Sequence, residues 1–248
     1  MQKMAGRAIY SKRNKMMDIE KKNGILYGVS TGPGDPELMT IKAKRCIENC
    51  QVIAAPRTKG KNCMALDIVK EIMDIEDKEI LYLDFAMQKN EKVLESTHRK
   101  QADMIEEYLA AGKDVAMLNI GDASLYGTFC YVRELIEADG YGTKTVAGVT
   151  SFCAVAAELG QSLTRMDEPL TIIPGAYVQV EKMLEQDGTK VIMKSGSALS
   201  EVKRILEEKG MSDGSAMVAN CGLHNQRIYK DIKKSDDDEG YFVTILVK

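Results

Sequence analysis

The sequence predicts an α/β protein built from two domains. Short apolar runs, typical of strands, alternate with segments in which apolar residues recur every three or four positions, as they do on one face of a helix. Glycine-rich turns follow several of the apolar runs, and such turns at the carboxyl ends of strands are where open α/β sheets bind ligands. The 248 residues are enough for one large core or two smaller ones.

The first half of this pattern begins at residue 24. The expected strands are 25–29, 51–55, 79–85, 114–120 and 144–149. The expected helices between them are 37–50, 64–73, 91–111 and 124–138. Strands and helices in alternation imply right-handed crossovers and a largely parallel sheet. Cys46 and Cys50 share a face of the first helix, where core packing and a metal site are the two interpretations.

A small-residue helix at 151–160 joins this half to a second set of elements. The expected strands are 170–173, 190–194, 215–220 and 241–247, with helices at 178–186 and 198–209. The acidic run 235–240 is expected to be a solvated turn before the last strand. The pattern divides the chain into an N-terminal α/β domain, 24–150, and a C-terminal α/β domain, 151–248, with the boundary somewhere between 145 and 168.

Residues 1–23 show no apolar periodicity and carry seven Lys or Arg, so we expect a flexible basic tail. The whole chain has a net charge of -3, which gives no general reason to expect nucleic acid or membrane partners. We find neither an apolar run long enough to span a bilayer nor a signal peptide before Gly24. The expectation is a cytoplasmic protein with reduced cysteines.

The loop 28–40 follows the first expected strand and contains Gly32 and Gly34, which allow close approach of another molecule to the backbone. Asp35 is a suitable N-cap, and Pro36 suits the first helical position. The spacing fits neither the lysine-bearing phosphate loop nor the dinucleotide fingerprint, and the Asp35 carboxylate would repel a phosphate. Two interpretations stay open: a tight turn with a capped helix, or a loop for a ligand other than a phosphate.

Three further glycine-containing stretches follow other expected strands: 121–128 (GDASLYGT), 148–152 (GVTSF), and 193–196 (MKSG) together with 219–222 (ANCG). In this order and at these separations, the stretches resemble the motifs of the tetrapyrrole (corrin/porphyrin) methylase family. Enzymes of that family transfer methyl groups from S-adenosylmethionine to precorrin-type macrocycles. The resemblance covers residues 24–248 and rests on the combination of motifs.

Within the family, the motifs are most similar to those of enzymes that methylate carbon 20 of precorrin-2, or of its cobalt complex, in cobalamin biosynthesis. Leu125 and Tyr126 stand where the uroporphyrinogen branch has a different motif, and the terminal Tyr241-Phe242 pair supports the same assignment. There are departures from the family pattern. Ser30 stands where glycine is usual, Ala123 and Ala147 where prolines are usual, and Gly127 where serine is common; all are small, so the backbone path can be kept.

The resemblance implies two αβα domains of the class III S-adenosylmethionine-dependent type, with the cofactor in the interdomain cleft, and a homodimer. By motif matching, the implied cofactor-binding residues are Pro33, Gly121, Asp122, Leu125, Tyr126, Thr128, Thr150, Ser151, Met193, Ala219, Asn220 and Cys221. Helix capping is the alternative role for Asp122, and core packing is the alternative for Met193. A place at the start of a helix is the alternative for Tyr126 and Thr128.

The macrocycle carries many carboxylates, so basic side chains are expected along its binding trough. The candidates are Arg57, Lys59, Lys61 and Lys194, each of which could instead be solvated surface. Asp35 is the candidate catalytic residue, as acceptor of the proton that leaves the methylated carbon. No metal site is expected in the protein; any cobalt would belong to the substrate.

Methyl transfer of this kind asks little of side chains, because a sulfonium methyl is already activated and the tetrapyrrole carbon is already nucleophilic. Orientation is then the main catalytic contribution. One alternative is a tetrapyrrole methylase acting at another carbon, of the precorrin-4 or uroporphyrinogen type. Another is a non-catalytic adenylate-binding α/β module. A methylase of a macromolecule would need a basic surface, whereas the chain from Gly24 onward is net acidic.

Overall fold

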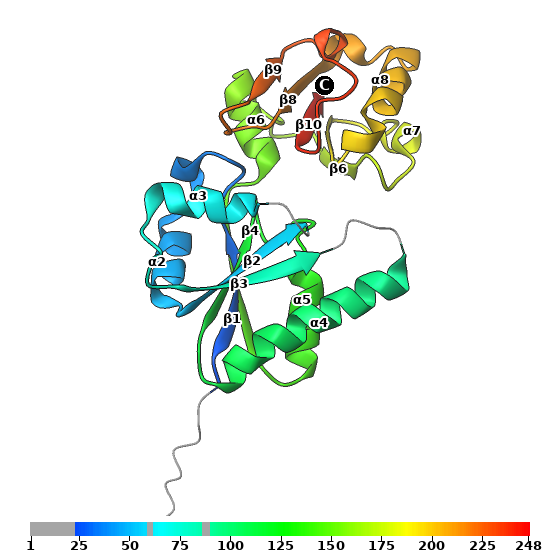
Figure 1. The fold of residues 1–248 in the computed structure, drawn as a ribbon. Coiled ribbons are helices and arrows are strands. Elements are labelled where there is room, and N and C mark those ends of the chain that lie inside the picture. The colour runs from blue at the N-terminus through cyan, green and yellow to red at the C-terminus, as the bar shows by residue number, and fades with distance from the viewer. Residues whose placement is uncertain (1–22, 59–61, 86–89) are drawn as a thin grey trace, which may run out of the picture.

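The computed structural model describes residues 23–58, 62–85 and 90–248. It contains two five-stranded sheets, each covered by helices, which lie one above the other in Figure 1. The α/β class with two sheets is therefore confirmed. The expected tail falls outside the described residues apart from Asn23, and so do Lys59 and Lys61.

The first sheet is parallel and has the strand order β3-β2-β4-β1-β5. Its strands are β1 (Ile25–Ser30), β2 (Val52–Thr58), β3 (Glu79–Phe85), β4 (Val115–Asn119) and β5 (Gly142–Val146). Strands β1 and β4 are neighbours, but the chain continues from them to opposite sides of the pair. The connection from β1 leads to β2 beyond β4, and the connection from β4 leads to β5 beyond β1. A switch of this kind separates the loops that follow the two strands and opens a crevice at their carboxyl ends.

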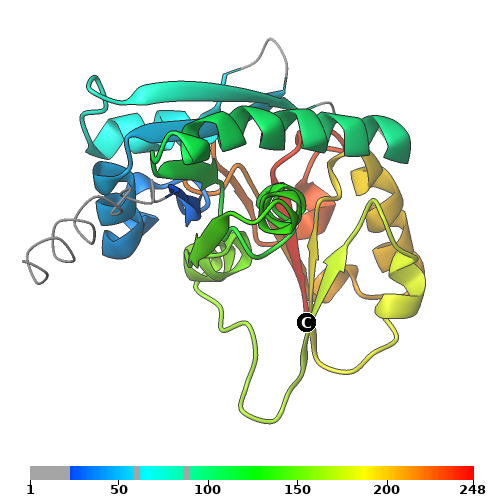
Figure 2. The ribbon, with the colours of Figure 1, turned by 90° about the horizontal axis from the view of Figure 1, so that it is seen from below.

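Two pairs of helices cover the two faces of this sheet, as the view from below shows (Figure 2). Helices α2 (Ile41–Asn49) and α3 (Met64–Ile72) bury one apolar cluster, and α4 (Glu91–Ala110) and α5 (Phe129–Ala138) bury the other. Cys50 belongs to the first cluster and Cys46 packs against it, which supports the core-packing interpretation of this pair.

The expected helix 37–50 is divided into two pieces, so that prediction was wrong in its first turn. Asp35 caps only the 3-10 turn η1 (Pro36–Leu38), where its carboxylate accepts a hydrogen bond from the Glu37 amide at 2.8 Å. Met39 is extended, and Thr40 caps α2 by accepting from the Ala43 amide. A second local cap therefore overrides the continuous apolar periodicity.

The expected helix 124–138 begins late, at Phe129. Its first turn is absent because Tyr126 has a φ of 52°, which is incompatible with a right-handed helix. Residues 120–128 therefore remain a loop at the end of β4.

The second sheet is mixed, with the order β6-β7-β10-β8-β9. Its strands are β6 (Leu170–Pro174), β7 (Thr189–Met193), β8 (Ser215–Ala219), β9 (Arg227–Tyr229) and β10 (Val243–Val247). Only β6 and β7 pair in parallel; β10 is antiparallel to both β7 and β8, and β8 is antiparallel to β9. The short strand β9 was not expected from the sequence.

Helices also cover both faces of the second sheet. Helix α6 (Ser151–Leu159) packs on one face, and α7 (Val180–Met183) and α8 (Leu199–Glu208) pack on the other. Three 3-10 turns lie at Gly196–Ala198 (η2), Ser212–Gly214 (η3) and Ile232–Lys234 (η4). Helix α7 is much shorter than the expected helix 178–186.

The acidic run 235–240 is not a fully solvated turn, which corrects the prediction. Asp237 is exposed, but the Glu239 side chain is buried. The hydroxyl of Tyr229 donates to Glu239 Oε1 at 2.5 Å, and the Arg227 guanidinium lies 2.5 Å from Oε2. Both partners come from β9, so the position of this carboxylate could not be foreseen without that strand.

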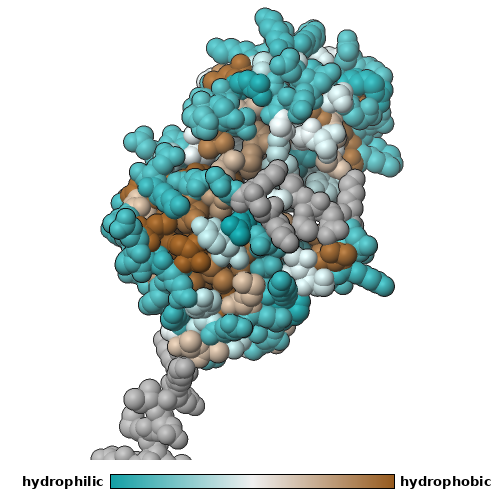
Figure 3. Space-filling model, viewed as in Figure 1, coloured by the Kyte–Doolittle hydropathy of each residue, from teal (hydrophilic) through white to brown (hydrophobic). Residues whose placement is uncertain are grey.

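The face of the molecule in Figure 3 is mostly polar, with an apolar area on the first domain beside α3 and β3. Strand β3 is an edge strand of the first sheet. The half-buried hydrophobic residues of α3, of β3 and of the segment between them include Ile72, Met73 and Ile80. In the described part of the chain, every helix is too short or too polar to cross a membrane.

Candidate functional site

The loops that follow β1 and β4 are joined through their backbones. The amide of Thr31 donates to Asn119 O at 2.8 Å, and the amide of Gly121 donates to Gly32 O at 2.7 Å. Gly32 and Gly121 have φ values of 78° and 72°, a left-handed conformation that glycine adopts without strain. The two loops therefore form one rigid rim at the switch point of the first sheet.

The buried Ser30 hydroxyl joins a third segment to this rim. It donates to Val146 O at 2.6 Å and accepts from the Ala123 amide at 2.9 Å. Gly148 is required beside it, because a Cβ there would stand 2.3 Å from the Cβ of Ser30. The departure from glycine at position 30 thus supplies a hydrogen bond between the ends of β1 and β5.

Asp122 also joins the loop after β4 to the loop after β5. Its carboxylate accepts from the Gly148 amide at 2.7 Å, from the Ser124 amide at 2.8 Å, and from the Ser124 hydroxyl. Burial alone would raise the pKa of Asp122; the three hydrogen bonds outweigh burial, so the pKa lies below its usual value. Since α5 begins only at Phe129, Asp122 does not cap that helix.

The two domains meet where the first loop touches the turn after β8. A Cβ on Gly34 would stand 2.3 Å from Cys221 O, and one on Gly222 would stand 2.4 Å from the amide nitrogen of Asp35. Two glycines therefore let two backbones pack directly against each other. This contact fixes one wall of the interdomain space.

Beside this contact, a cavity of about 290 Å³ lies between the domains. It is lined by these sequence-predicted residues: Pro33, Gly121, Asp122, Leu125, Tyr126, Thr128, Thr150, Ser151, Met193, Lys194 and Cys221. It is also lined by residues that we had not assigned to the site, among them Pro56, Met64, Asn119, Gly127, Tyr241 and Phe242. The structure therefore brings together predicted residues from both halves of the chain.

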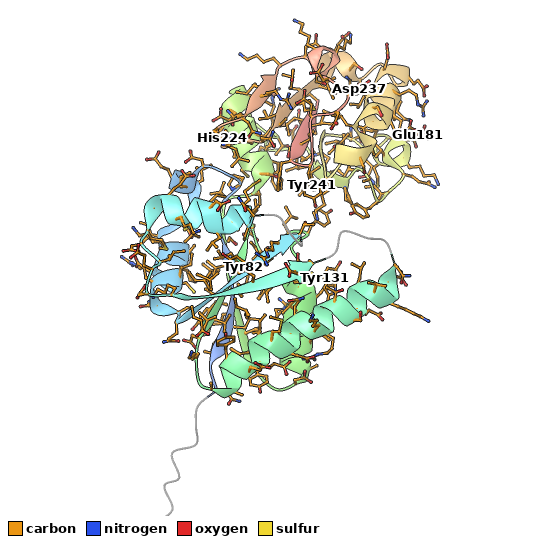
Figure 4. The ribbon with its side chains drawn as sticks, in the orientation of Figure 1. Tyr82, Tyr131, Glu181, His224, Asp237 and Tyr241 are labelled. Carbon is orange, nitrogen blue, oxygen red and sulfur yellow. The ribbon has the colours of Figure 1, made fainter. Side chains whose placement is uncertain are left out.

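Tyr241 and Phe242 close the cavity from the second domain, and Figure 4 shows Tyr241 facing the first domain. Their rings pack edge to face, with centroids 5.0 Å apart. The Tyr241-Phe242 pair belongs to the motifs that carry the family resemblance, so the signal that could have placed these residues in the site was present in the sequence.

Three non-glycine residues in the described ranges have positive φ, and all three lie at or beside the cavity: Tyr126 (52°), Lys194 (55°) and Asn220 (53°). Each follows a strand: β4, β7 and β8, respectively. Backbone strain of this kind, costing about 1–3 kcal/mol per residue, is concentrated at functional sites.

Lys194 and Tyr126 form a contact across the cavity. The Lys194 ammonium donates to Tyr126 O at 3.0 Å and lies 5.6 Å from the centroid of the Tyr126 ring. Burial lowers the pKa of Lys194, an effect that the nearby Cys130 partly opposes. An amine held here keeps donor capacity for an anionic group, because an ammonium has three N–H bonds.

Two further polar groups in the cavity are informative. Thr150 stands at the N-cap position of α6, but its buried Oγ1 makes no capping hydrogen bond and has no other partner among the described residues. Burial, Glu158 and Asp35 raise the pKa of the Cys221 thiol to about 11, so the thiol stays neutral near pH 7. The orphaned hydroxyl is available to a ligand, and the thiol is held in its unreactive form.

Other sequence-predicted residues lie outside the cavity. Asp35 sits at the domain contact, and its carboxylate is occupied by the Glu37 amide. Arg57 pairs with Asp84 at 2.8 Å and stacks on Tyr82 at 4.2 Å. Ala219 and Asn220 flank the cavity without lining it, while Lys59 and Lys61 lie outside the described residues.

In the described ranges, groups of three or more His, Cys, Asp or Glu arranged to hold a metal are absent. His224 is exposed on the second domain (Figure 4), and His98 stacks on Tyr131 with ring centroids 4.8 Å apart.

Comparison with a family model and with a known protein indicates the same family. The family model described as Tetrapyrrole (Corrin/Porphyrin) Methylases matches residues 25–233. A cobalt-precorrin-2 C(20)-methyltransferase of Salmonella typhimurium is 30% identical over 230 residues, which cover 91% of this chain and 96% of that protein.

Two solved structures share the fold. The structure of a cobalt precorrin-4 methyltransferase superposes with a TM-score of 0.71 at 20% identity, covering 90% of this chain and 94% of that one. A uroporphyrin-III C-methyl transferase from Thermus thermophilus, complexed with S-adenosyl homocysteine, superposes with a TM-score of 0.66 at 18% identity, covering 90% and 92% of the two chains.

Proposed function

The chain belongs to the tetrapyrrole (corrin/porphyrin) methylase family, and we propose that it methylates carbon 20 of precorrin-2, or of its cobalt complex, in cobalamin biosynthesis. The observation that carries this proposal is the interdomain cavity, which gathers the family motifs from both halves of the chain. The carbon is inferred from the Leu125-Tyr126 and Tyr241-Phe242 pairs together with the similarity to a C(20)-methyltransferase.

We propose S-adenosylmethionine as the methyl donor, bound in this cavity. The residues present fit it: the buried Oγ1 of Thr150 lacks a partner, and the backbone at Gly121 carries no side chain that would exclude a ligand. Pro33, Leu125 and Met193 add apolar surface for a flat adenine ring. When bound, the donor supplies an activated methyl group on a sulfonium.

The protein's own contribution is to hold the reacting groups in place. The Asp122 and Ser30 hydrogen bonds fix the loops that form the rim, so little reorganisation is needed on binding. The neutral Cys221 thiol lines the cavity without offering a thiolate that could take the methyl group. Orientation in a pre-formed cavity is therefore the main catalytic effect that we propose.

For the tetrapyrrole, Lys194 is the basic side chain best placed to meet a carboxylate, since it lines the cavity and has a free donor capacity. Arg57, beside Pro56 at the end of β2, remains a proposed second contact at the outer margin. Asp35 remains a proposed proton acceptor, with capping of η1 as its alternative role. The family resemblance also leads us to propose a homodimer, which light scattering in solution tests.

A mass-spectrometric assay with precorrin-2 and with its cobalt complex tests the reaction. One added methyl, located at carbon 20 by isotope-labelled NMR, is expected; a methyl at another carbon would assign the chain to a different branch of the family. The shared fold with a precorrin-4 methyltransferase makes that branch the second candidate. A non-catalytic adenylate-binding module predicts tighter binding of ATP than of S-adenosylhomocysteine, so calorimetry with both ligands distinguishes it.

A further inference from the structure

We infer that Glu239 is a positioning residue for the cofactor cavity: its buried carboxylate holds the segment 240–242 so that Tyr241 and Phe242 close the cavity. The inference rests on the proposed function, because it takes the interdomain cavity to be the cofactor site. Glu239 lies outside that cavity, so it would act through its neighbours in the chain.

The burial of Glu239 needs an explanation. Its residue is 1% exposed, whereas the side chain of Asp237 in the same acidic run is 72% exposed. A buried carboxylate costs free energy unless charge and hydrogen bonds compensate it. Here Tyr229 donates to Oε1 at 2.5 Å and the Asp236 amide donates to Oε1 at 3.3 Å. Oε2 accepts no hydrogen bond from the described residues, and the Arg227 guanidinium, 2.5 Å away, compensates it by charge. The compensation is therefore built from β9 and from the loop itself.

The Glu239 carboxylate joins the segment before β10 to strand β9. Strand β8 lies between β10 and β9, and Ala219 at the end of β8 is paired with Val243 on one side and Arg227 on the other. An interaction between Glu239, which precedes β10, and Arg227 on β9 therefore closes over the end of β8. Of the two residues immediately after that end, Asn220 flanks the cavity and Cys221 lines it.

Two backbone contacts carry this restraint to the cavity. The Asn220 amide donates to Phe242 O at 2.8 Å, which joins the turn after β8 to the segment 240–242. On the other side, Gly196 packs so closely that a Cβ there would stand 2.6 Å from Gly240 O and 3.1 Å from the Cα of Tyr241. Two contacts thus restrain segment 240–242: the anchored side chain of Glu239 at its start and the close packing of Gly196 against its backbone. Loss of the carboxylate would remove the first of these restraints.

The test compares Glu239→Gln with Asp237→Asn in the full chain. Both substitutions remove one negative charge from the same run, but only the first lies in the buried network. Calorimetry with S-adenosylhomocysteine is expected to give a dissociation constant raised about tenfold for Glu239→Gln, and unchanged within about twofold for Asp237→Asn. In steady-state turnover, the KM for S-adenosylmethionine rises and kcat changes less than about threefold, because Glu239 touches no reacting atom.

A double-mutant cycle with Tyr241→Ala separates positioning from a general loss of stability. If Glu239 acts through this segment, the effect of Glu239→Gln on the dissociation constant shrinks when the Tyr241 side chain is already absent. Equal effects in both backgrounds, or wild-type binding by Glu239→Gln with an unchanged melting temperature, would overturn the inference. Failure of the wild-type chain to bind S-adenosylhomocysteine would instead count against the proposed function. Should Glu239→Gln not fold, Arg227→Met, which removes the other partner at a half-exposed position, gives the same comparison.

Discussion

The Gly222 contact offers a sharp test of how the domains are held around the cavity. In Gly222→Ala, the new Cβ would stand 2.4 Å from the amide nitrogen of Asp35 and 3.1 Å from the carbonyl carbon of Gly34. Ordinary contact begins near 3.4 Å, so the first loop and the turn after β8 would have to separate by about 1 Å. Gly222 also has a φ of 79°, which adds about 1 kcal/mol of backbone strain for alanine.

Gly210→Ala is the matched control. Gly210 has a φ of 67°, and a Cβ there would meet nothing within 4 Å, so alanine carries only the backbone strain. The two variants should therefore share a loss of about 1 kcal/mol in the free energy of unfolding, measured by urea denaturation. The additional effect of Gly222→Ala measures the steric term at the domain contact.

That additional effect is expected mainly in ligand binding. A displacement of about 1 Å at one wall of the cavity can cost on the order of 100-fold, so Gly222→Ala should weaken S-adenosylhomocysteine binding by about 10- to 100-fold. Gly210→Ala should bind as the wild type does. If both variants lose equal stability and both bind normally, the contact between the first loop and the turn after β8 does not set the cavity, and this reasoning fails.

Three other substitutions test single side chains. Asp122→Asn should lower the free energy of unfolding by about 1–3 kcal/mol at pH 7, because the charge is lost and the single oxygen of Asn can serve either Gly148 or Ser124 but not both. Since the pKa of Asp122 is depressed in the folded state, this stabilisation is present above about pH 4 and is lost as the pH falls through the folded pKa; a wild-type advantage that does not decrease as the pH is lowered below about 4 in urea titrations would contradict it. Lys194→Met should raise the KM for the tetrapyrrole about tenfold, with the S-adenosylhomocysteine dissociation constant changed less than about threefold, and equal effects on both would place Lys194 at the cofactor instead. If Asp35 accepts the proton, as we propose, Asp35→Asn should lower turnover ~100-fold and leave the melting temperature close to that of the wild type, because Asn caps as well as Asp; wild-type turnover with an unchanged melting temperature would reduce Asp35 to a cap of η1.

Much of the fold follows from local pattern. Strand β3 occupies the predicted residues 79–85, and α4 ends one residue before its predicted end, because apolar periodicity and flanking turns fix such elements locally. The failures occur where one short-range signal competes with another. Thr40 starts α2 inside an unbroken apolar stripe, and Tyr126 holds a left-handed backbone where periodicity predicts a helix.

The loops that form the site could be predicted from the sequence where they contain glycine turns. Those turns identified the loops after β1, β4, β7 and β8, which do meet at the cavity. Side-chain partnerships were not predictable in the same way. The Arg57 and Asp84 pair requires the register of β2 against β3, and the burial of Glu239 requires β9, which has three residues and is too short to show an apolar alternation.

The hydrogen bond between Ser30 and Ala123 couples the effects of substitutions at these two positions. In the usual family pattern, glycine at position 30 has no hydroxyl and proline at position 123 has no N–H, so neither group needs the other. Here the Ser30 hydroxyl and the Ala123 N–H satisfy each other in a fully buried place. The change Ser30→Gly alone would bury an orphaned N–H donor, and Ala123→Pro alone would press the serine hydroxyl against a ring with no donor to meet it. Substitutions at the two positions are therefore energetically coupled, and the loss of one partner costs less when the other partner is removed with it.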